Sequence, residues 1–183
     1  YQTEFTEMFR GEFGTTSTAN TPHPQFVSQG VQFENYFAPE DNVMAEVVAE
    51  VVESQTSIHF LAFSFTDDKL AETVLFRKMK GVDIKGIFES RGAGSASSQC
   101  SQLLRNGADV RLDGNSYTLH HKVIIIDSKT VIFGSFNFSE NADKNNDENL
   151  LIVHSAELAQ KFEQEFQKLL SISKAPSASC GSD

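Results

Sequence analysis

The chain has 183 residues and carries 15 Lys and Arg against 25 Asp and Glu, for a formal net charge of -10. A chain of this length can form one domain that buries roughly 70% of its unfolded surface, so the core needs no network of disulfides. The acidic balance gives no global sign of a nucleic-acid binder, and no run of about 18 apolar residues is present to span a membrane. Any site for a polyanion must therefore be a local positive pocket.

The two cysteines, Cys100 and Cys180, are too few for a disulfide framework. Neither has the CxxC spacing of a zinc module, so a structural zinc site is not expected. The sequence leaves open whether the two cysteines pair with each other.

Residues 1–30 are polar, apart from the patch EFTEMFRGEF, in which Phe5, Met8 and Phe9 have the i, i+3, i+4 spacing of a short helix. Residues 15–29 then resemble an extended linker. The patch also resembles KFEQEFQKLL near the C-terminus, as it would if an upstream domain of the same type ended before residue 15. Two unrelated amphipathic helices would look alike too. Because the chain does not begin with Met, we expect it to be an excerpt of a longer or processed product.

Helices and strands alternate along residues 31–172, which we assign to one catalytic domain. Strands are expected at 31–37, 57–65, 82–88, 110–112 and 148–153, with two more beyond residue 120. Helices are expected after the Pro-Glu-Asp-Asn segment at 39–42, at 67–79, at 99–106 and from Ser155 to about residue 170. The pattern predicts an α/β sandwich with a mixed, largely parallel sheet and helices on both faces. Residues 173–183 are predicted to form a flexible tail.

The stretch HHKVIIIDSKTVIFGSFNFSENADKNNDEN, which begins at His120, gathers the polar chemistry of the chain. Residues i and i+2 of a strand share a face, so His120 and Lys122 point one way and His121 the other. Ser135 and Asn137 pair in the same manner. Two neighbouring strands would therefore present an imidazole, an ammonium, a hydroxyl and a carboxamide to one pocket, which is a set suited to phosphate chemistry.

The order His-x-Lys, four residues, Asp, and then Gly-Ser-x-Asn resembles the HKD signature of the phospholipase D superfamily. Glu148, in NNDEN, resembles the glutamate of the small nuclease branch, which includes single-motif bacterial endonucleases and mitochondrial piRNA-pathway relatives. The likeness covers about residues 31–170 and implies a phospholipase D-like sandwich. The candidate catalytic residues are His120, Lys122, Ser135, Asn137, Glu148 and Asp127.

The resemblance implies a phosphodiesterase that forms a phosphohistidine, which water then hydrolyses. A neutral imidazole is nucleophilic near pH 7, so His120 is the candidate nucleophile, and Glu148 is expected to hold its distal N–H. Lys122 and Asn137 should bind the nonbridging phosphate oxygens, and Ser135 can add a hydroxyl donor.

Asp127 lies at the far end of the strand from His120, so we favour a structural role in which it binds turn backbone around Ser128 and Lys129. His121 is expected to pack on the opposite face, and His59 to be a satisfied core residue. Adjacent histidines on a strand diverge, so we expect no metal at His120, His121 and Asp127 and no cofactor.

A single motif supplies half of this chemistry, because a second acid must protonate the leaving oxygen. No second His-x-Lys occurs in the chain. The second HKD half is therefore expected from a homodimer, in which two His120 side chains face one pocket, or from an upstream domain.

Nucleic acid and phospholipid both offer a phosphodiester, and small size with the NNDEN segment favours an endonuclease. A local basic cleft could be formed by Lys122, Arg91 and Arg111. The sequence shows no basic amphipathic helix of the kind that binds lipid surfaces. Phospholipase D-type hydrolysis of phospholipid head groups stays the alternative. The loop 90–98 is predicted to be a lid or a plain connector. A noncatalytic binding or scaffold half is the third hypothesis, and the Ser, Thr and Asn-rich linker favours a secreted or extracytoplasmic location.

Overall fold

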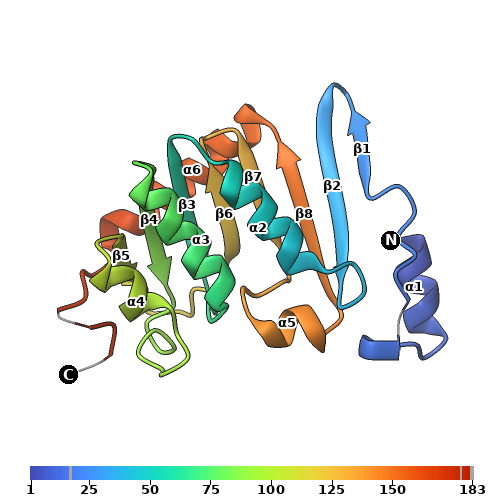
Figure 1. The fold of residues 1–183 in the computed structure, drawn as a ribbon, viewed down its shortest axis with the longest axis horizontal. Helices are drawn as coiled ribbons and strands as arrows, with labels where there is room; N and C mark the ends of the chain where they lie inside the picture. Colours follow the sequence, from blue (N-terminus) through green and yellow to red (C-terminus); the bar gives the residue numbers. More distant parts are fainter. Residues whose placement is uncertain (17, 178, 182–183) are drawn as a thin grey trace.

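The computed structural model of the chain describes residues 1–16, 18–177 and 179–181. An eight-stranded sheet, in the order β1-β2-β8-β7-β6-β3-β4-β5, has helices on both faces (Figure 1). The strands are β1 (Gln25–Ser28), β2 (Val31–Ala38), β3 (Ser57–Ala62), β4 (Asp83–Phe88), β5 (Asp109–Leu112), β6 (Lys122–Ile126), β7 (Thr130–Gly134) and β8 (Glu148–His154). The helices are α1 (Gln2–Phe9), η1 (Gly14–Thr16, a 3-10 turn), α2 (Val43–Glu53), α3 (Asp68–Met79), α4 (Cys100–Arg105), α5 (Glu140–Lys144) and α6 (Ala156–Ile172).

The sheet is mostly antiparallel, so the prediction of a largely parallel sheet is wrong. Among the strand pairs of the described residues, β3–β4 and β4–β5 alone are parallel, because α3 and α4 carry the chain back across the sheet between those strands. The pairs β1–β2, β2–β8, β3–β6, β6–β7 and β7–β8 are antiparallel. A three-residue turn joins β6 to β7, which is too short for a parallel crossover. Alternation of helices and strands along the chain does not reveal this second half of the sheet.

Strand β6 is buried along its whole length between two layers of side chains. Ile124 and Ile126 pack in the cluster that α2, α3 and α4 share with the sheet. Val123 and Ile125 pack on the other face with residues of α6 such as Phe166. A strand covered on both faces is expected to be apolar throughout, and this explains the run Val-Ile-Ile-Ile.

The residues at which two of the helices were expected to begin, Asp67 and Ser155, are side-chain caps. Asp67 accepts a hydrogen bond from the Leu70 N–H at 2.7 Å at the start of α3. Ser155 accepts one from the Leu158 N–H at 3.3 Å at the start of α6. These caps satisfy N–H groups that have no partner inside the helix. None of the helices in the described part of the chain combines the length and apolar character that a bilayer crossing requires.

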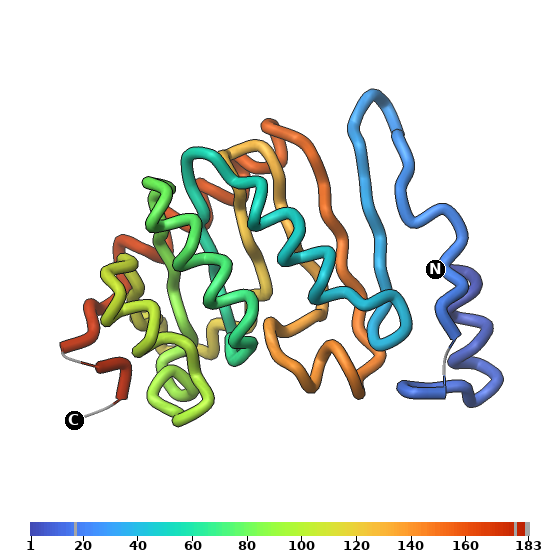
Figure 2. The backbone as a smooth tube through the Cα atoms, viewed as in Figure 1, coloured from blue at the N-terminus to red at the C-terminus, as the bar shows by residue number. Residues whose placement is uncertain are grey.

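The N-terminal segment lies at one end of the molecule, opposite the C-terminal residues (Figure 2). The predicted short helix is α1, which lies beyond the edge of the sheet near β2. The rings of Tyr1 and Phe37 form an edge-to-face contact, with centroids 5.2 Å apart. The stretch expected to be an extended linker contains β1, which pairs with β2 and extends the sheet.

The C-terminal segment is fastened to the domain at two points. Lys174 pairs with Leu112 through two backbone hydrogen bonds of 2.8 Å. Cys180 is buried and forms a disulfide with Cys100 of α4, the pairing that the sequence left open. The described part of the segment predicted to be a flexible tail is therefore held against α4, and residues 178, 182 and 183 lie outside the described residues.

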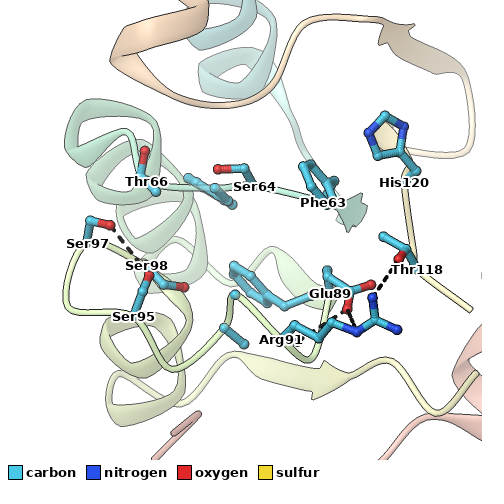
Figure 3. Close-up of a pocket in the computed structure, with 14 residues that line it drawn as sticks. Phe63, Ser64, Thr66, Glu89, Arg91, Ser95, Ser97, Ser98, Thr118 and His120 are labelled. Atoms are coloured by element: carbon cyan, nitrogen blue, oxygen red, sulfur yellow. Dashed lines mark hydrogen bonds and ion pairs between the residues drawn. The ribbon is translucent and has the colours of Figure 1, made fainter. Parts of the chain in front are cut away.

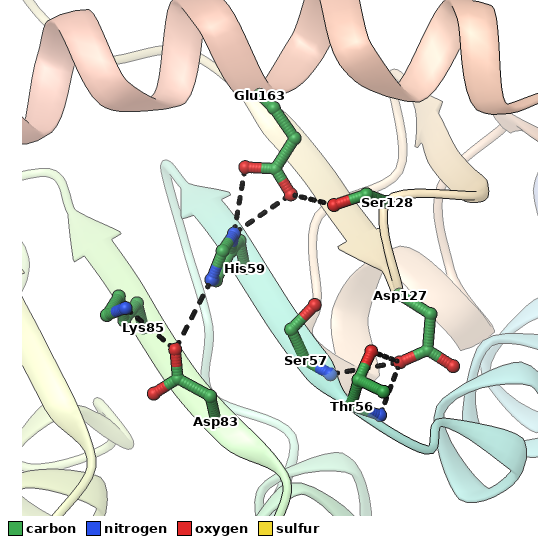
Figure 4. A network of polar contacts seen from close by, with 8 residues as sticks. All are labelled: Thr56, Ser57, His59, Asp83, Lys85, Asp127, Ser128 and Glu163. Carbon is green, nitrogen blue, oxygen red and sulfur yellow. Dashed lines mark hydrogen bonds and ion pairs between the residues drawn. The ribbon is translucent and has the colours of Figure 1, made fainter.

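Asp127 fastens the β6–β7 turn to the start of β3 (Figure 4). Its carboxylate accepts N–H groups from Gln55, Thr56 and Ser57 at 2.7–2.9 Å. Asp127 has a structural role, as predicted. Its partners differ from the predicted ones, because it binds the backbone of residues 55–57 and not that around Ser128 and Lys129. The strand that follows Thr56 is distant in sequence, and no local pattern indicated this contact.

His59 lies near the hydrogen bonds of Asp127, on the side of the sheet that faces α6 (Figure 4). It is 8% exposed, and its Nδ1 lies 2.8 Å from Oε2 of Glu163. Its Nε2 lies 3.8 Å from Asp83. His59 is thus a core histidine, as expected, but it is satisfied only at Nδ1, because its buried Nε2 has no hydrogen-bond partner among the described residues.

We predict that Asp127→Asn lowers the free energy of unfolding by about 1–2 kcal/mol at neutral pH, because one acceptor oxygen is lost. Burial raises the pKa of Asp127, but hydrogen bonds from the backbone of residues 55–57 outweigh burial and lower the pKa below its ordinary value. A lowered pKa stabilises the fold above the unfolded value and loses that effect as the pH falls through the folded value. The difference between the variant and wild type should therefore shrink below about pH 4.

Urea unfolding at several pH values measures this effect, with exposed Lys129→Ala as a neighbouring control. Equal stability of Asp127→Asn and wild type at pH 7 would contradict the role assigned to Asp127.

Candidate active site

A buried lysine and an exposed histidine meet at the start of β6. Lys122 is 6% exposed, and its Nζ lies 3.2 Å from Nε2 of His120 and donates to the His120 carbonyl oxygen at 2.9 Å. The same Nζ lies 4.6 Å from the centre of the Phe63 ring. The predicted convergence of His120 and Lys122 on one face is confirmed by these contacts.

The pairing of β6 with β3 produces this convergence. Lys122 is opposite Ala62, and the Phe63 N–H donates to the His121 carbonyl oxygen at 2.8 Å. The Phe63 ring therefore lies under His120, with ring centroids 4.5 Å apart and a tilt of 53°. Phe63 restrains the imidazole and also faces the ammonium, where the ring quadrupole attracts the cation. Sequence reasoning missed Phe63, although its place just past an apolar strand was visible.

Burial lowers the pKa of Lys122 below the ordinary lysine range, and the negative charge of Glu148 opposes this shift. Removing an ammonium from water is costly unless an anion or a set of acceptors compensates. Lys122 has one carbonyl, one imidazole and a nearby carboxylate, so a bound phosphate oxygen would complete its surroundings.

Glu148 is the first residue of β8 and accepts a hydrogen bond from the Asn146 amide at 3.1 Å. Among the described residues no hydrogen bond joins it to His120, so its predicted role of holding the distal N–H is not made within this chain. Its carboxylate acts on Lys122 through charge. Glu148 lines a second cavity of about 410 Å³ together with Ser135.

The Gly-Ser turn after β7 is fixed to β8. The Ser135 N–H donates to the Asn149 carbonyl oxygen, and the Ser135 Oγ accepts the Asn149 N–H, both at 3.0 Å. The Ser135 hydroxyl can still donate its own hydrogen to a ligand. Gly134 is required here, because a Cβ would lie 2.1 Å from the Asn149 oxygen.

Asn137 follows on the same turn and is half-buried. Its Oδ1 is buried and has no hydrogen-bond partner among residues 1–16, 18–177 and 179–181. Its backbone carbonyl accepts the Ser139 N–H at 2.8 Å. In the described chain, neither Ser135 nor Asn137 is hydrogen-bonded to His120 or Lys122. Sheet register nevertheless places them at the same end of adjacent strands, since Val123 is opposite Phe133.

His120 opens into a cavity of about 710 Å³ (Figure 3). The cavity is lined by Phe63, Ser64, Phe65, Thr66, Phe88, Glu89, Arg91, Gly92, Ala93, Ser95, Ser97, Ser98, Thr118 and His120. The loop 90–98 thus forms one wall, and whether it closes as a lid stays a prediction. The volume is within the range of sites for small organic ligands.

Glu89 fixes the chain just before His120, and sequence reasoning missed it. This buried carboxylate accepts the Leu119 N–H at 2.5 Å and the Arg91 N–H at 3.2 Å. Arg91 in turn donates to the Thr118 hydroxyl at 3.1 Å at the edge of the cavity. Arg91 therefore places a guanidinium near His120, although Glu89 lies 3.9 Å from it and offsets its charge. Arg111 pairs with Asp109 at 2.7 Å and does not line the cavity.

His121 has the environment of a packing residue. Burial lowers its pKa, and the negative charges of Glu165 and Asp113 oppose the shift. Val123, two residues along the chain, packs with residues of α6, so His121 faces the layer opposite the cavity, as the strand alternation predicts.

We predict that Glu148→Gln lowers the pKa of Lys122 further, because the variant removes the negative charge that favours the ammonium form. NMR titration of isotope-labelled lysine side chains measures this pKa. Glu140→Gln removes a charge from an exposed position on α5 and should leave Lys122 unchanged. An unchanged Lys122 titration in Glu148→Gln would contradict the coupling of the two residues.

Comparisons with known proteins identify the family of the chain. The family model described as "Cardiolipin synthase, PLD-like domain" matches residues 47–170. A protein named phospholipase D from Rickettsia felis is 32% identical over 128 residues, which cover 70% of this chain and 64% of that protein. A protein named mitochondrial cardiolipin hydrolase from Xenopus tropicalis is 30% identical over 129 residues, which cover 70% of this chain and 61% of that protein. The chain thus spans just over three fifths of the length of these two relatives.

The fold is also found among solved structures. Nuc from Salmonella typhimurium, a phospholipase D family member, matches with a TM-score of 0.75 and 28% identity, covering 80% of this chain and 98% of that chain. Nuc is one of the small, nuclease-like members that the motif resembles. The extent of the family match, together with the meeting of His120 and Lys122 at an open cavity, shows that the chain belongs to the phospholipase D superfamily.

Proposed function

We propose that the chain is the catalytic half of an endonuclease that hydrolyses nucleic-acid phosphodiesters through a phosphohistidine on His120. The observation that carries this proposal is the 3.2 Å approach of the Lys122 ammonium to the His120 imidazole at the mouth of the cavity. An exposed imidazole can reach phosphorus, and the adjacent ammonium can stabilise the charge that develops on the phosphate oxygens.

In the proposed reaction a ring nitrogen of His120 attacks phosphorus, and the bond to the leaving oxygen breaks. An acid gives that oxygen a proton. Water then attacks the phosphohistidine, transfers a proton to a base and releases His120. Lys122 and the Ser135 hydroxyl act as donors to the nonbridging oxygens, as does Asn137, whose side chain belongs to the same turn.

The acid must come from outside this set, since the other four histidines are placed elsewhere. His59 is held by Glu163, and His154 lies 2.9 Å from Glu34. His121 faces α6, and His23 is an exposed residue of the N-terminal segment. We therefore propose that a second HKD half completes the site, from another copy of the chain or from an upstream domain. In that assembly Glu148, which is free of His120 here, would orient a catalytic histidine that faces it.

Nucleic acid is favoured as the substrate by likeness to the small nuclease-like branch and by the local arrangement of charge. Lys122 lies 3.2 Å from His120, and Arg91 lines the same cavity with its charge partly offset by Glu89. Phe63 and Phe65 offer apolar walls. A single strand can thread such a site without base-specific contacts. The names of the Rickettsia and Xenopus relatives support the alternative, a hydrolase of phospholipid head groups.

A secreted or extracytoplasmic location is also proposed. The disulfide between Cys100 and Cys180 supports it, because disulfides persist in oxidising compartments.

We predict that the protein cleaves labelled single-stranded DNA and that His120→Asn lowers the rate about 10³-fold or more. His121→Asn is the matched control, since it alters the neighbouring imidazole on the opposite face, and its activity should stay within a few-fold of wild type. Gel electrophoresis of the DNA measures cleavage, and parallel samples contain phosphatidylcholine or cardiolipin vesicles.

Cleavage of lipid alone would overturn the choice of substrate, and activity that survives in His120→Asn would overturn the mechanism. Inactivity on every substrate despite a confirmed second half would favour the binding or scaffold hypothesis. Sedimentation of the same sample shows whether the chain is a monomer or a dimer. An inactive monomer would favour an upstream domain as the source of the second HKD half.

A further inference from the structure

Three carboxylates meet where α1 rests against the loop between β2 and α2. Glu4 and Glu7 lie one turn apart on α1, and Glu40 lies in the loop. Glu4 is 7% exposed and Glu7 is 8% exposed, so both are buried more deeply than glutamates usually are. One oxygen from each of the three side chains lies within 4.8 Å of the others.

These carboxylates have too few donors. The Asn20 amide donates to Oε1 of Glu7. Oε2 of Glu7 and Oε2 of Glu40 are buried, and neither has a hydrogen-bond partner in the part of the chain that the structure describes. Within the described residues, no Lys or Arg forms an ion pair with any of the three. A buried carboxylate oxygen without a donor or a cation is costly.

Two further carboxylates surround the cluster and add negative charge, but their own donors are accounted for. Asp41 accepts the Phe37 N–H at 2.9 Å and the hydroxyl of Thr21 at 2.5 Å. Asp147 accepts the Gly14 N–H at 2.6 Å. Both charges raise the pKa of Glu4, although burial is the larger cause. The oxygens that lack a donor therefore belong to Glu7 and Glu40, and the buried carboxylate of Glu4 lies beside them.

A shared proton would meet only part of this need for donors. Burial raises the pKa of Glu40 to about 7, and Glu4 is its neighbour. A proton between these two would satisfy that pair. It would supply no donor to Oε2 of Glu7, which would stay buried and unpaired. A divalent cation compensates all three carboxylates at once.

We propose that Glu4, Glu7 and Glu40 form a binding site for a divalent cation, and that the cation is Ca²⁺. Ca²⁺ binds carboxylate oxygens at about 2.3–2.6 Å, so two oxygens on one ion can be separated by up to about 5 Å. The spacing in the cluster meets this limit. Ca²⁺ also accepts irregular geometry and water as further ligands, which suits a site built from a helix and a loop.

The site would fasten α1 beside the catalytic edge of the sheet. Glu4, Phe5 and Met8 of α1 form one wall of the cavity whose other wall includes Ser135 and Glu148. Removal of the cation would loosen this wall. The ion takes no part in the proposed chemistry at His120, so this inference is independent of the proposed function.

Thermal unfolding of the full chain in EDTA and in CaCl₂ tests the site. Wild type should gain about 5 °C or more when free Ca²⁺ is about 100 times its Kd. Glu7→Gln should lose this gain, and in EDTA it should be at least as stable as wild type, because one repelling charge is gone. Glu12→Gln is the matched control, since it removes the same charge from an exposed position just beyond α1 and should keep the gain.

Isothermal titration of CaCl₂ into wild type and Glu40→Gln gives a second measurement if Glu7→Gln does not fold. Binding in wild type and its loss in Glu40→Gln support the site. The proposal is overturned if CaCl₂ has no effect on wild type, or if Glu7→Gln and Glu12→Gln gain equally. An equal gain in MgCl₂ would overturn the assignment to Ca²⁺. Below the melting temperature, turnover should persist in EDTA, so failure here and failure of the proposed function are distinct results.

Discussion

The burial of the Lys122 ammonium is the constraint on which the site depends. Strand β6 lies between β3 and β7 and is covered on both faces, so its first residue cannot reach water freely. The ammonium is held by the His120 carbonyl, the His120 ring and the Phe63 face, with the Glu148 charge nearby. The Lys122 ammonium still lacks an anionic hydrogen-bond acceptor in direct contact, and a phosphate oxygen would supply one. A strongly acidic protein can thus hold a positive pocket without a basic surface.

The antiparallel half of the sheet is what brings the parts of the motif to one edge. The short turn at Asp127 returns β6 as β7, and Gly134 lets the next turn close against β8. His120, Ser135 and Glu148 are therefore gathered from three separate places along the chain. The hydrogen bonds of Asp127 lie at the far end of β6 from Lys122. One end of the strand therefore carries contacts that stabilise the fold, and the other carries the candidate catalytic residues.

Local patterns were enough to predict much of this molecule. Strand alternation correctly placed His120 with Lys122 and separated His121, and the caps at Asp67 and Ser155 were visible as Asp and Ser before helical segments. Contacts between distant segments could not be predicted. Asp127 binds residues 55–57, which lie some seventy positions earlier. The prediction of a largely parallel sheet was wrong for the same reason, because helices and strands alternate along the chain in parallel and antiparallel folds alike. The cluster of Glu4, Glu7 and Glu40 depends on where α1 docks, which no spacing in the sequence reveals.

His120 is proposed to carry the phosphoryl group during turnover. Rapid acid-free quenching during turnover of a labelled phosphodiester, followed by peptide mass spectrometry, can detect that group. A phosphoryl adduct is expected on the peptide that contains His120, located to His120 rather than His121 and absent from His120→Asn. Turnover with the adduct on another residue, or with no adduct when water attack is the slow step, would contradict this role of His120.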